Sequence, residues 1–356
     1  MNPLKYVRPN ILALEPYSTA RDEFKGGDIS VWLDANESPY DNGVNRYPDP
    51  HNRKLKARIA ALKGMPAEAI FIGGAGSDEA IDLTYRIFCT PGRDRALVCP
   101  PTYGVYGVAA QINDVAVIEE PLGPGFTLPV DKILSHNGEV KLVWVCSPNN
   151  PTGNAFPEVE ILRLTENFDG IVAVDEAYVD FQQRPSLLRH LKHHPNMIVL
   201  QTFSKAWGMA GLRCGMAFGA PELIELYNRV KYPYNMNGPT QAEVLRRIDE
   251  GLGGHVEEIL SERGRLVKGL SALPCVLKVH PSDANFVLVE VTKPDEIYRY
   301  LIENGVIVRN RSKVAGCGPA LRFTVGTPEE NERVIELLKK VGGADDIILA
   351  QGVSPG

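Results

Sequence analysis

The sequence contains few cysteines, and no two of them form a C-x-x-C pair. In a chain of 356 residues, this scatter predicts small buried hydrophobic side chains in a reducing compartment and excludes a disulfide framework. A thiol nucleophile stays an open alternative at Cys146 and Cys214, because both lie near glycine-rich loops. The six cysteines are Cys89, Cys99, Cys146, Cys214, Cys275 and Cys317.

Long apolar runs and basic blocks are absent as well. No run approaches the roughly 18 uncharged apolar residues of a membrane span, and proline and charges interrupt every short apolar run within residues 1–22. We therefore expect no membrane contact and no secretory signal, and we expect a cytoplasmic protein. The net charge of −6, from 38 Lys+Arg against 44 Asp+Glu, comes without a basic stripe, which argues against nucleic acid as a partner.

A group of histidines lies at His190, His193 and His194. Their spacing can place two imidazoles on one helix face, but no nearby carboxylate or cysteine completes a set of metal ligands. We therefore expect a solvated helix end and no metal.

Seven apolar runs alternate with helix-scale segments between about residues 70 and 230. Several runs are continuously apolar, which is typical of strands that helices cover on both faces. The pattern predicts an α/β fold, with a large three-layer domain built on a mostly parallel sheet. In such sheets, ligands bind beyond the carboxyl ends of the strands. The runs lie at 69–73, 95–100, 115–121, 141–148, 170–176, 197–203 and 214–219.

The pattern changes after residue 240, where a long charged helical stretch leads into shorter strands and two further helical segments. This part predicts a smaller α+β domain. The first 45 residues are irregular and rich in proline, so we expect an arm and not an independent fold. The predicted organisation is an arm over 1–45 that packs with the small domain, a large domain over 46–240, and a connecting helix with the small domain over 241–356.

Gly76, Ser77 and Asp78 stand where the first predicted strand gives way to a helix. Glycine-permitted backbone followed by the free N–H groups of a helix start forms an anion site, most often for phosphate. Glu79 occupies the third glycine position of G-x-G-x-x-G, and the lysine of a P-loop is missing, so neither nucleotide motif applies. A plain helix start, with Ser77 as N-cap and acidic residues in the first turn, explains the same residues equally well.

Two further strand ends carry side chains that suit a flat ligand. Tyr103 lies on a loop flanked by proline and glycine, where its ring can stack on a ligand, although such an aromatic often has no role. Asn150 belongs to SPNNPTG (147–153), in which two consecutive asparagines follow a buried strand. Turn chemistry explains the Asn-Pro pair, but it does not explain why the turn follows an unbroken apolar run.

Asp175 and Lys205 end two successive apolar runs, separated by about the length of one βαβ unit. We expect them to end neighbouring strands and to face one crevice. A lysine in a partly desolvated pocket loses proton affinity from its usual pKa of about 10.4 and becomes an amine nucleophile. A carboxylate at the end of a buried strand is costly unless it pairs with a cation, and the alternative for Asp175 is a helix N-cap.

These residues form one coherent set. Lys205 can trap an aldehyde, Asp175 can keep a pyridine nitrogen protonated, and Asn150 with Tyr178 can hold a ring hydroxyl. The ligand that the set describes is pyridoxal 5′-phosphate. The phosphate cup of this set consists of Gly76, Ser77, Asp78, Ser204 and Arg213.

The segments SPNNPTG, DEAY, SKAWGMAGLRCG and LRFTVGT resemble the fold type I aminotransferases, and in particular the histidinol-phosphate aminotransferases. The resemblance extends from residues 15–21 to 321–327. It implies that Lys205 binds the cofactor covalently and moves the substrate proton, and that Asp175 pairs with the ring nitrogen. It also implies that Asn150 and Tyr178 hydrogen-bond the ring oxygen O3′, and that Tyr103 stacks on the ring.

The same resemblance implies a homodimer with shared active sites. It implies two pairs of small-molecule substrates, glutamate with 2-oxoglutarate and a phosphorylated amino compound, histidinol phosphate, with imidazole-acetol phosphate. Arg322 resembles the arginine that binds the carboxylate of glutamate, and Tyr47 resembles a tyrosine that reaches across from the partner subunit. Arg311 shares a strand face with Arg309, so which of the two contacts the substrate phosphate stays open. The substrate-binding set implied is Tyr17, Asn36, Tyr47, Arg309 and Arg322.

Other functions on the same scaffold remain as alternatives. They are an aromatic or broad-range aminotransferase and a decarboxylase of a phosphorylated amino acid. A cofactor-binding regulator is a third, and the complete catalytic set argues against it.

Overall fold

The computed structural model describes residues 2–17 and 29–342. Residues 18–21 of the segment at 15–21, and residues 343–356 of the expected small domain, lie outside the described residues. Within the described parts, no helix combines the length and the apolar character that crossing a membrane requires.

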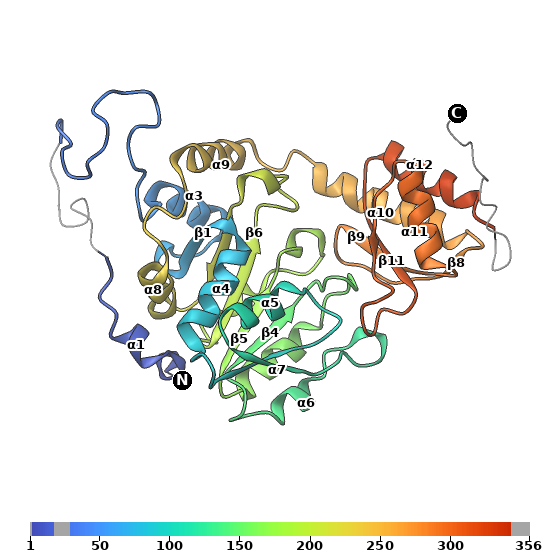
Figure 1. The fold of residues 1–356 in the computed structure, drawn as a ribbon, viewed down its shortest axis with the longest axis horizontal. Helices are drawn as coiled ribbons and strands as arrows, with labels where there is room; N and C mark the ends of the chain where they lie inside the picture. Colours follow the sequence, from blue (N-terminus) through green and yellow to red (C-terminus); the bar gives the residue numbers. More distant parts are fainter. Residues whose placement is uncertain (1, 18–28, 343–356) are drawn as a thin grey trace, which may run out of the picture.

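The larger of two sheets has seven strands in the order β1-β7-β6-β5-β4-β2-β3 (Figure 1). Neighbouring strands from β3 to β6 run parallel, while β7 is antiparallel to both β1 and β6. The seven predicted runs are these strands, and the predicted α/β class is confirmed. The strands are β1 (Ile70–Gly76), β2 (Arg95–Val98), β3 (Ala116–Glu119), β4 (Leu142–Cys146), β5 (Ile171–Asp175), β6 (Met197–Thr202) and β7 (Gly215–Phe218).

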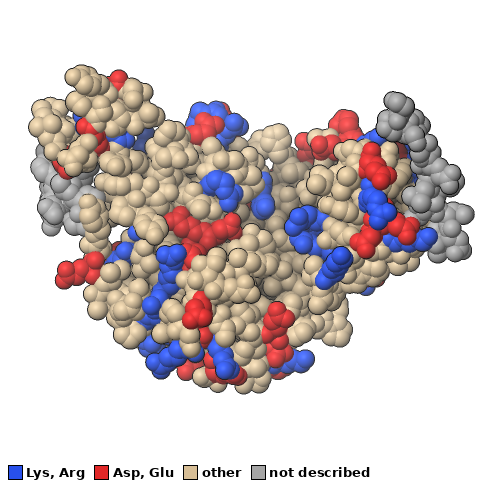
Figure 2. Space-filling view, in the orientation of Figure 1, with Lys and Arg blue, Asp and Glu red and all other residues tan. Residues whose placement is uncertain are grey.

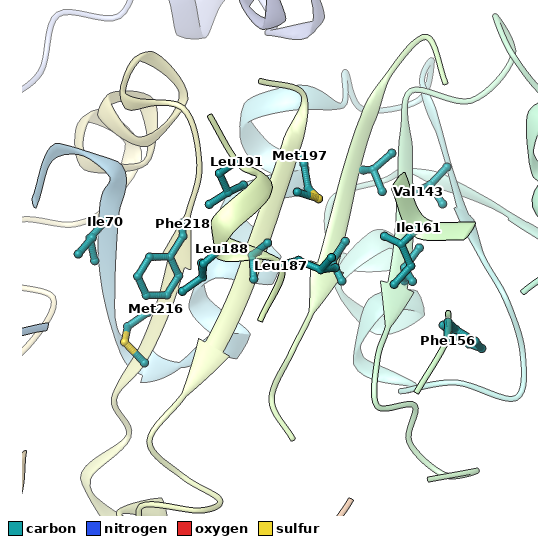
Figure 3. Packing of buried hydrophobic residues seen from close by; sticks show 14 of the residues in the cluster. Ile70, Val143, Phe156, Ile161, Leu187, Leu188, Leu191, Met197, Met216 and Phe218 are labelled. Atoms are coloured by element: carbon teal, nitrogen blue, oxygen red, sulfur yellow. The ribbon is translucent and has the colours of Figure 1, made fainter. Parts of the chain in front are cut away.

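Alternate side chains of each central strand enter two separate cores, one on each face of the sheet. Because successive residues of a strand point to opposite faces, Val143 and Val145 of β4 pack into one core, and Leu142 and Trp144 pack into the other. Figure 3 shows the first of these cores. A strand buried on both faces has no solvent-facing side, which is why these runs lack polar alternation.

Helices complete the three layers by covering both faces. One core takes side chains from the short helix α1 (Pro9–Leu12) and from α4 (Ser77–Phe88), α5 (Val105–Ile112) and α8 (Pro221–Val230). The other takes side chains from α3 (Arg53–Lys63), α6 (Val130–Leu134), α7 (Glu158–Asn167) and α9 (Gly238–Glu250).

The connection between β5 and β6, which is described throughout, contains no α-helix, so the βαβ unit expected between Asp175 and Lys205 is wrong in this detail. The chain instead makes two short 3-10 turns, η4 (Val179–Phe181) and η5 (Leu187–His190). Pro185 lies just before the second turn and Pro195 lies beyond it, and proline removes a backbone donor that a longer helix would use. The two strands are nevertheless adjacent and parallel, as expected.

The buried carboxylate of Glu176 anchors this connection. It accepts hydrogen bonds from the backbone N–H of Leu187 (2.8 Å), the side-chain amide of Gln201 (2.9 Å) and the hydroxyl of Ser186. A buried carboxylate is tolerated when several donors surround it. Glu176 therefore stabilises the connection that places the end of β5 beside the end of β6.

The smaller sheet has four antiparallel strands in the order β10-β11-β9-β8 and lies to one side of the larger body (Figure 1). Its core includes Leu266 and Leu338, from two of the three helices that pack on it. Val244 of α9 packs in a core of the larger sheet, whereas Leu266 of α10 packs in the core of the smaller sheet. The change from the larger body to the smaller one therefore lies between α9 and α10. The domain boundaries at residues 45 and 240 stay predictions. The elements are α10 (His255–Ser271), β8 (Val276–Val279), β9 (Phe286–Val291), α11 (Pro294–Glu303), β10 (Arg309–Asn310), β11 (Ala320–Thr324) and α12 (Pro328–Lys339).

The N-terminal segment differs from expectation, because its described first part packs on the larger body and not on the small domain. Tyr6, Val7 and Ile11 are buried in the same core as side chains of α4 and α8. These three side chains form an apolar cluster that covers one end of the layer of helices. Residues 29–47 follow a path along the side of the molecule away from the smaller sheet (Figure 1). Several large apolar side chains of this segment are exposed, including Leu33 at 87%.

Candidate active site

A cavity of about 340 Å³ lies between the larger body and the smaller sheet. Its walls come from the carboxyl ends of β4, β5 and β6, from the start of α4 and from strands of the smaller sheet. Such a position, beyond the strand ends of a parallel sheet, is where ligands bind in this architecture. The predicted site residues that line it are Ser77, Asp78, Tyr103, Asn150, Asp175, Tyr178, Ser204, Lys205, Arg213, Arg309 and Arg322.

The turn from β1 into α4 forms one end of this cavity. Gly76 is the N-cap of α4, with φ of +77°, and no side-chain hydrogen bond caps the helix, so Ser77 is not the N-cap that the plain alternative required. The first N–H groups of α4 therefore have no partner within the helix and remain available to an anion. A Cβ on Gly76 would lie 2.7 Å from a guanidinium nitrogen of Arg213. The positive φ, which L side chains rarely adopt, favours glycine here, and any other residue would also displace the end of the Arg213 side chain.

Arg213 is tied to that turn at both its backbone and its side chain. Its carbonyl accepts from the N–H of Gly76 (2.9 Å), and its guanidinium donates to the carbonyl of Ala75 (3.0 Å). The guanidinium also lies 3.5 Å from a carboxylate oxygen of Asp78. The hydroxyl of Ser204, which also lines the cavity, accepts from the hydroxyl of Thr202 (2.9 Å). Ser204, Arg213 and the first N–H groups of α4 supply hydrogen-bond donors of the kind that a phosphate requires.

Glu79 has a role at this turn that sequence reasoning did not find. Its carboxylate accepts from the backbone N–H groups of Gly74 (2.5 Å) and Ala75 (3.3 Å) and from the side chain of Asn235. The residue that breaks the dinucleotide motif thus holds the glycine turn in place. The signal in the sequence was an acidic residue directly after a glycine-rich turn.

Asp175 ends β5 and is only 2% exposed. Its Oδ2 accepts from the hydroxyl of Tyr106 (2.7 Å), and its Oδ1 accepts from the backbone N–H of Ala177 (3.0 Å). Burial raises its pKa, and these two hydrogen bonds oppose that rise. Within the described residues it has no ion-pair partner, although it lines the cavity. The carboxylate is therefore ready to pair with a cationic group of a bound ligand.

Lys205 follows the neighbouring strand β6 and opens into the same cavity. Although part of its side chain is exposed to the cavity, removal from bulk water lowers its pKa, and the positive charge of Arg322 lowers it further. Its Nζ lies 5.5 Å from the centre of the Tyr178 ring. The structure thus places the predicted amine and the predicted carboxylate at adjacent strand ends, as the spacing indicated.

Asn150 links two predicted site residues. Its side-chain amide donates to the hydroxyl of Tyr178 (3.4 Å), and its oxygen accepts from the guanidinium of Arg322. The neighbouring Asn149 instead donates to the carbonyl of Pro101 (2.8 Å) and shapes the loop. Asn150 therefore faces the cavity, whereas Asn149 stabilises the turn.

The aromatic wall of the cavity consists of Tyr103 with Tyr106 behind it. The Tyr103 hydroxyl donates to Asp78 (3.2 Å), and its ring meets the edge of Tyr106 at 5.5 Å between centroids. Sequence reasoning named Tyr103 but missed Tyr106. The signal was the repetition of tyrosine three residues later, which places both on one side of the start of α5.

The thiol alternatives have no support in this geometry. Cys146 lines the cavity, but burial raises its pKa well above the usual range for a thiol. Burial also raises the pKa of Cys214 to about 12. Neither sulfur would be a thiolate near neutral pH.

Three of the predicted substrate residues do not line this cavity within the same chain. Tyr17 is 74% exposed. Asn36 and Tyr47 line a second cavity, formed by residues 35–48 and the start of α9. The ring of Tyr47 stacks on Tyr234 at 4.5 Å between centroids. A tyrosine that serves the partner's site would lie outside its own, so the prediction for Tyr47 still stands as a prediction, as do those for Tyr17 and Asn36.

The residues present fit pyridoxal phosphate. The glycine cradle at Gly76 with Arg213 suits the phosphate, the buried Asp175 suits a protonated ring nitrogen, and Lys205 suits the aldehyde. Fold and site together define a pyridoxal-phosphate-dependent enzyme.

Comparison with known proteins agrees with this class and narrows it. The family model for aminotransferase class I and II matches residues 20–338. A histidinol-phosphate aminotransferase of Parabacteroides distasonis is 50% identical over 94% of this chain and 97% of its own, and one of Bacteroides fragilis is 47% identical with the same coverage. The chain therefore belongs to the class I and II aminotransferases, and within them to the histidinol-phosphate aminotransferases.

Solved structures agree on the fold. The histidinol-phosphate aminotransferase of Clostridium acetobutylicum superposes with a TM-score of 0.77 at 22% identity, covering 83% of this chain and 90% of that one. The enzyme of Sinorhizobium meliloti, solved in complex with pyridoxal-5′-phosphate, gives a TM-score of 0.76 at 22% identity, covering 83% and 82%.

Proposed function

We propose that this protein transfers an amino group between glutamate and imidazole-acetol phosphate, giving 2-oxoglutarate and histidinol phosphate, in the biosynthesis of L-histidine. We also propose that it works as a cytoplasmic homodimer with shared active sites. The observation that carries the proposal is a single cavity that brings together Lys205, Asp175 and the arginines Arg309, Arg311 and Arg322.

Pyridoxal phosphate, when bound, supplies an electron-withdrawing ring that stabilises the negative charge left on the substrate carbon when its proton is removed. The N–H groups of Ser77 and Asp78, with the side chains of Ser204 and Arg213, would hold its phosphate. Asp175 would pair with the ring nitrogen and keep it protonated. These contacts position the ring and set its electronic character.

Asn150 and Tyr178 would hydrogen-bond the ring oxygen, while Tyr103 would cover the ring face. Asn150 also accepts a hydrogen bond from Arg322. The Asn150 amide therefore orients both Tyr178, which would bind the ring oxygen, and Arg322, which would bind the substrate anion. The ring and the anion are thereby held in a fixed relation.

Lys205 would act on protons through its Nζ. Its lowered pKa keeps a larger share of the amine neutral near pH 7 than an ordinary lysine would have. A neutral amine at the cavity wall can take the proton from the substrate carbon and return it to the neighbouring carbon of the cofactor, as general base and then acid. Arg322 would hold the carboxylate of glutamate in a bidentate contact.

The partner subunit would complete the substrate site. Tyr47 and Asn36 line a cavity other than the one that holds Lys205, and they lie in a segment with exposed apolar side chains such as Val31 and Leu33. Exposed apolar groups gathered on one segment favour burial against another surface. In a homodimer, this segment would bring Tyr47 towards the other subunit's arginines, with Tyr17 closing over the phosphate.

A spectroscopic titration of the purified holoenzyme tests the function. Histidinol phosphate at micromolar concentration should abolish the absorption band of the lysine-bound cofactor, and 2-oxoglutarate should restore it. A stronger response to phenylalanine would move the enzyme to the aromatic class, and release of carbon dioxide from threonine phosphate would make it a decarboxylase. The variant Lys205→Ala is the control, since it should retain no transamination with any of these substrates.

A further inference from the structure

A short connection joins the smaller lobe, residues 255–342, to the larger body. Among the described residues, the chain passes between them over residues 251–254, from α9 to α10 (Figure 1). Gly251 and Gly254 have φ of +76° and +79°, and a Cβ on either would meet nothing within 4 Å. Because glycine has the widest conformational freedom, this connection alone does not fix where the smaller lobe lies. Contacts elsewhere have to fix it.

The cavity that holds Lys205 depends on the position of this lobe, because its walls come from both parts. Lys205 and Asp175 belong to the larger body, whereas Arg322 belongs to β11 of the smaller lobe. Figure 2 shows basic side chains on the edge of the smaller lobe that faces the larger body. A misplacement of about 1 Å can strongly impair a catalytic site, so the lobe has to be held closely.

Asp283 holds the smaller lobe on the loop that carries Asn150. It lies between β8 and β9, and it contacts this loop of the larger body through both its backbone and its side chain. Its backbone N–H donates to the carbonyl of Gly153 (2.7 Å), and its Oδ2 accepts from the backbone N–H of Ala155 (2.9 Å). Two hydrogen bonds to one loop fix both the distance and the orientation of the lobe.

The two loops meet most closely at Gly153. Its φ is +85°, and a Cβ there would lie 2.6 Å from Oγ of Ser282. That hydroxyl donates to the carbonyl of Phe286 (2.5 Å) and accepts from the backbone N–H of Ala284 (3.1 Å). The turn around Asp283 is therefore bonded to the start of β9, and a displacement of the turn would be passed to the smaller sheet.

The start of β9 links this contact to Arg322. The ring of Phe286 is buried, and its centre lies 5.0 Å from the guanidinium carbon of Arg322 and 5.1 Å from the centre of the Tyr178 ring. Tyr178 belongs to the larger body, so Phe286 lies between the two parts. Arg322 in turn donates to Asn150. Asp283 and Arg322 thus bind the same loop from the smaller lobe.

We propose that Asp283 is a positioning residue that holds the smaller lobe where Arg322 reaches both Asn150 and the substrate carboxylate. The role of Arg322 towards that carboxylate rests on the proposed function. Asp283 does not line the cavity, so it acts through the lobe and touches neither substrate nor cofactor. The loop keeps its place without Asp283, because Asn149 donates to the carbonyl of Pro101 (2.8 Å) within the larger body. Loss of Asp283 therefore loosens the lobe and leaves the cofactor site in place.

The first test measures the apparent Kd for glutamate in the variant Asp283→Ala, from the absorption of the bound cofactor. Loss of a hydrogen bond to a carboxylate predicts a Kd about tenfold higher. The Kd of the apoenzyme for pyridoxal phosphate should change far less. Asp283→Asn keeps an oxygen that can accept from the Ala155 N–H, so it should remain close to the wild type. Equal rises of the two Kd values in Asp283→Ala, or no rise for glutamate, would overturn the proposal.

A double-mutant cycle with Arg322→Gln tests whether Asp283 acts through Arg322. If it does, Asp283→Ala raises the Kd for glutamate much less in the Arg322→Gln background than in the wild type. The same fold-change in both backgrounds would refute the proposal. Asp169→Ala is the matched control, because Asp169 also joins two segments distant in sequence, through the Tyr6 hydroxyl (2.6 Å), but does not line the cavity. It should leave the Kd for glutamate unchanged.

Failure of the proposed function is a separate result, since the wild-type enzyme would then not respond to glutamate. Capture of pyridoxal phosphate by the apoenzyme tests Asp283 even in that case, because only the neutral amine of Lys205 reacts with the aldehyde. Burial and then the charge of Arg322 lower the pKa of Lys205. A loosened lobe admits water and withdraws that charge, so Asp283→Ala should move the pH midpoint of capture upwards. Direct loss of a negative charge would move the midpoint downwards, so a lower or unchanged midpoint would contradict the positioning role.

Discussion

The Tyr106 hydroxyl donates a hydrogen bond of 2.7 Å to Oδ2 of Asp175. Tyr106 is fully buried, and its ring stacks on Trp144 with 4.8 Å between centroids and 7° between planes, which fixes the direction of the hydroxyl. The bond stabilises the charged form of Asp175 against the burial that raises its pKa. Tyr106 is thus a positioning residue that helps to keep the carboxylate ionised for a ring nitrogen.

Replacing Tyr106 with Phe should shift the pH dependence of turnover. Without this donor the pKa of Asp175 rises further. As the pH is lowered, the carboxylate is then protonated at a higher pH than in the wild type, and once protonated it no longer pairs with a cationic ring. The acid limb of the kcat profile is expected to move to higher pH. Steady-state kinetics across the acid range measure the shift.

Tyr85→Phe provides the control for that experiment. The Tyr85 hydroxyl is also buried and donates to the carbonyl of Tyr106 (2.9 Å), but it has no contact with Asp175. Its loss should lower the melting temperature without moving the acid limb. If both variants move the limb equally, Tyr106 acts through packing alone.

Asp175→Ala should lower kcat more than it weakens cofactor binding. The carboxylate keeps the ring nitrogen protonated in the reaction, whereas the phosphate cup and Lys205 hold the cofactor in place. Removing one preorganised electrostatic group from an active site typically reduces kcat about 10²- to 10³-fold. Turnover and the absorption of bound cofactor, measured on the same sample, separate the two effects, and a wild-type kcat would contradict the assigned role.

Much of this site follows from elementary rules applied to the sequence. Continuous apolar runs have to be covered on both faces, so β4, β5 and β6 were predictable. Parallel strands place their carboxyl ends at one edge, which brings Asp175 beside Lys205 whatever form the connection takes. The connection itself was not predictable, because it depends on how Glu176 gathers donors from residues that are distant in the sequence.

Contacts between side chains of different elements lay beyond sequence reasoning. The partnership of Tyr106 with Asp175 depends on the stacking of α5 against Trp144 of β4, which no local pattern records. In contrast, the glycine at position 76 was predictable because a turn from strand to helix around an anion leaves no room for a side chain.

Gly76→Ala should weaken the binding of pyridoxal phosphate. The new methyl group would meet the Arg213 guanidinium at 2.7 Å, and the φ of +77° is strained for any L side chain. Strain of about 1–3 kcal/mol, together with a displaced Arg213, predicts a cofactor Kd at least tenfold higher. Fluorescence titration of the apoenzyme with cofactor measures this change.

The variant Gly64→Ala is a control that separates the effect of backbone strain from the effect of a change in the phosphate site. Gly64 ends α3 with φ of +65°, and a Cβ there would contact nothing within 4 Å. It should lower stability by a similar amount but leave the cofactor Kd unchanged. An equal rise of the Kd in both variants would show that global destabilisation, and not the cradle, weakens binding.

The pH dependence of cofactor capture should report the pKa of Lys205. Only the neutral amine attacks the aldehyde, so the rate at which apoenzyme captures pyridoxal phosphate rises with pH through that pKa. Burial and then the charge of Arg322 lower the pKa of Lys205, so the midpoint is expected below the usual value of about 10.4. Stopped-flow absorbance over a series of pH values measures the midpoint.

The variant Arg322→Gln tests whether the positive charge of Arg322 lowers the pKa of Lys205. Removing a positive charge beside Lys205 favours its protonated form, so the midpoint should move to higher pH. Arg322→Lys keeps the charge while losing the planar donor fork to Asn150, and it should leave the midpoint close to that of the wild type. A shift of equal size in both variants would mean that the geometry around Asn150, and not the charge of Arg322, controls the pKa of the amine.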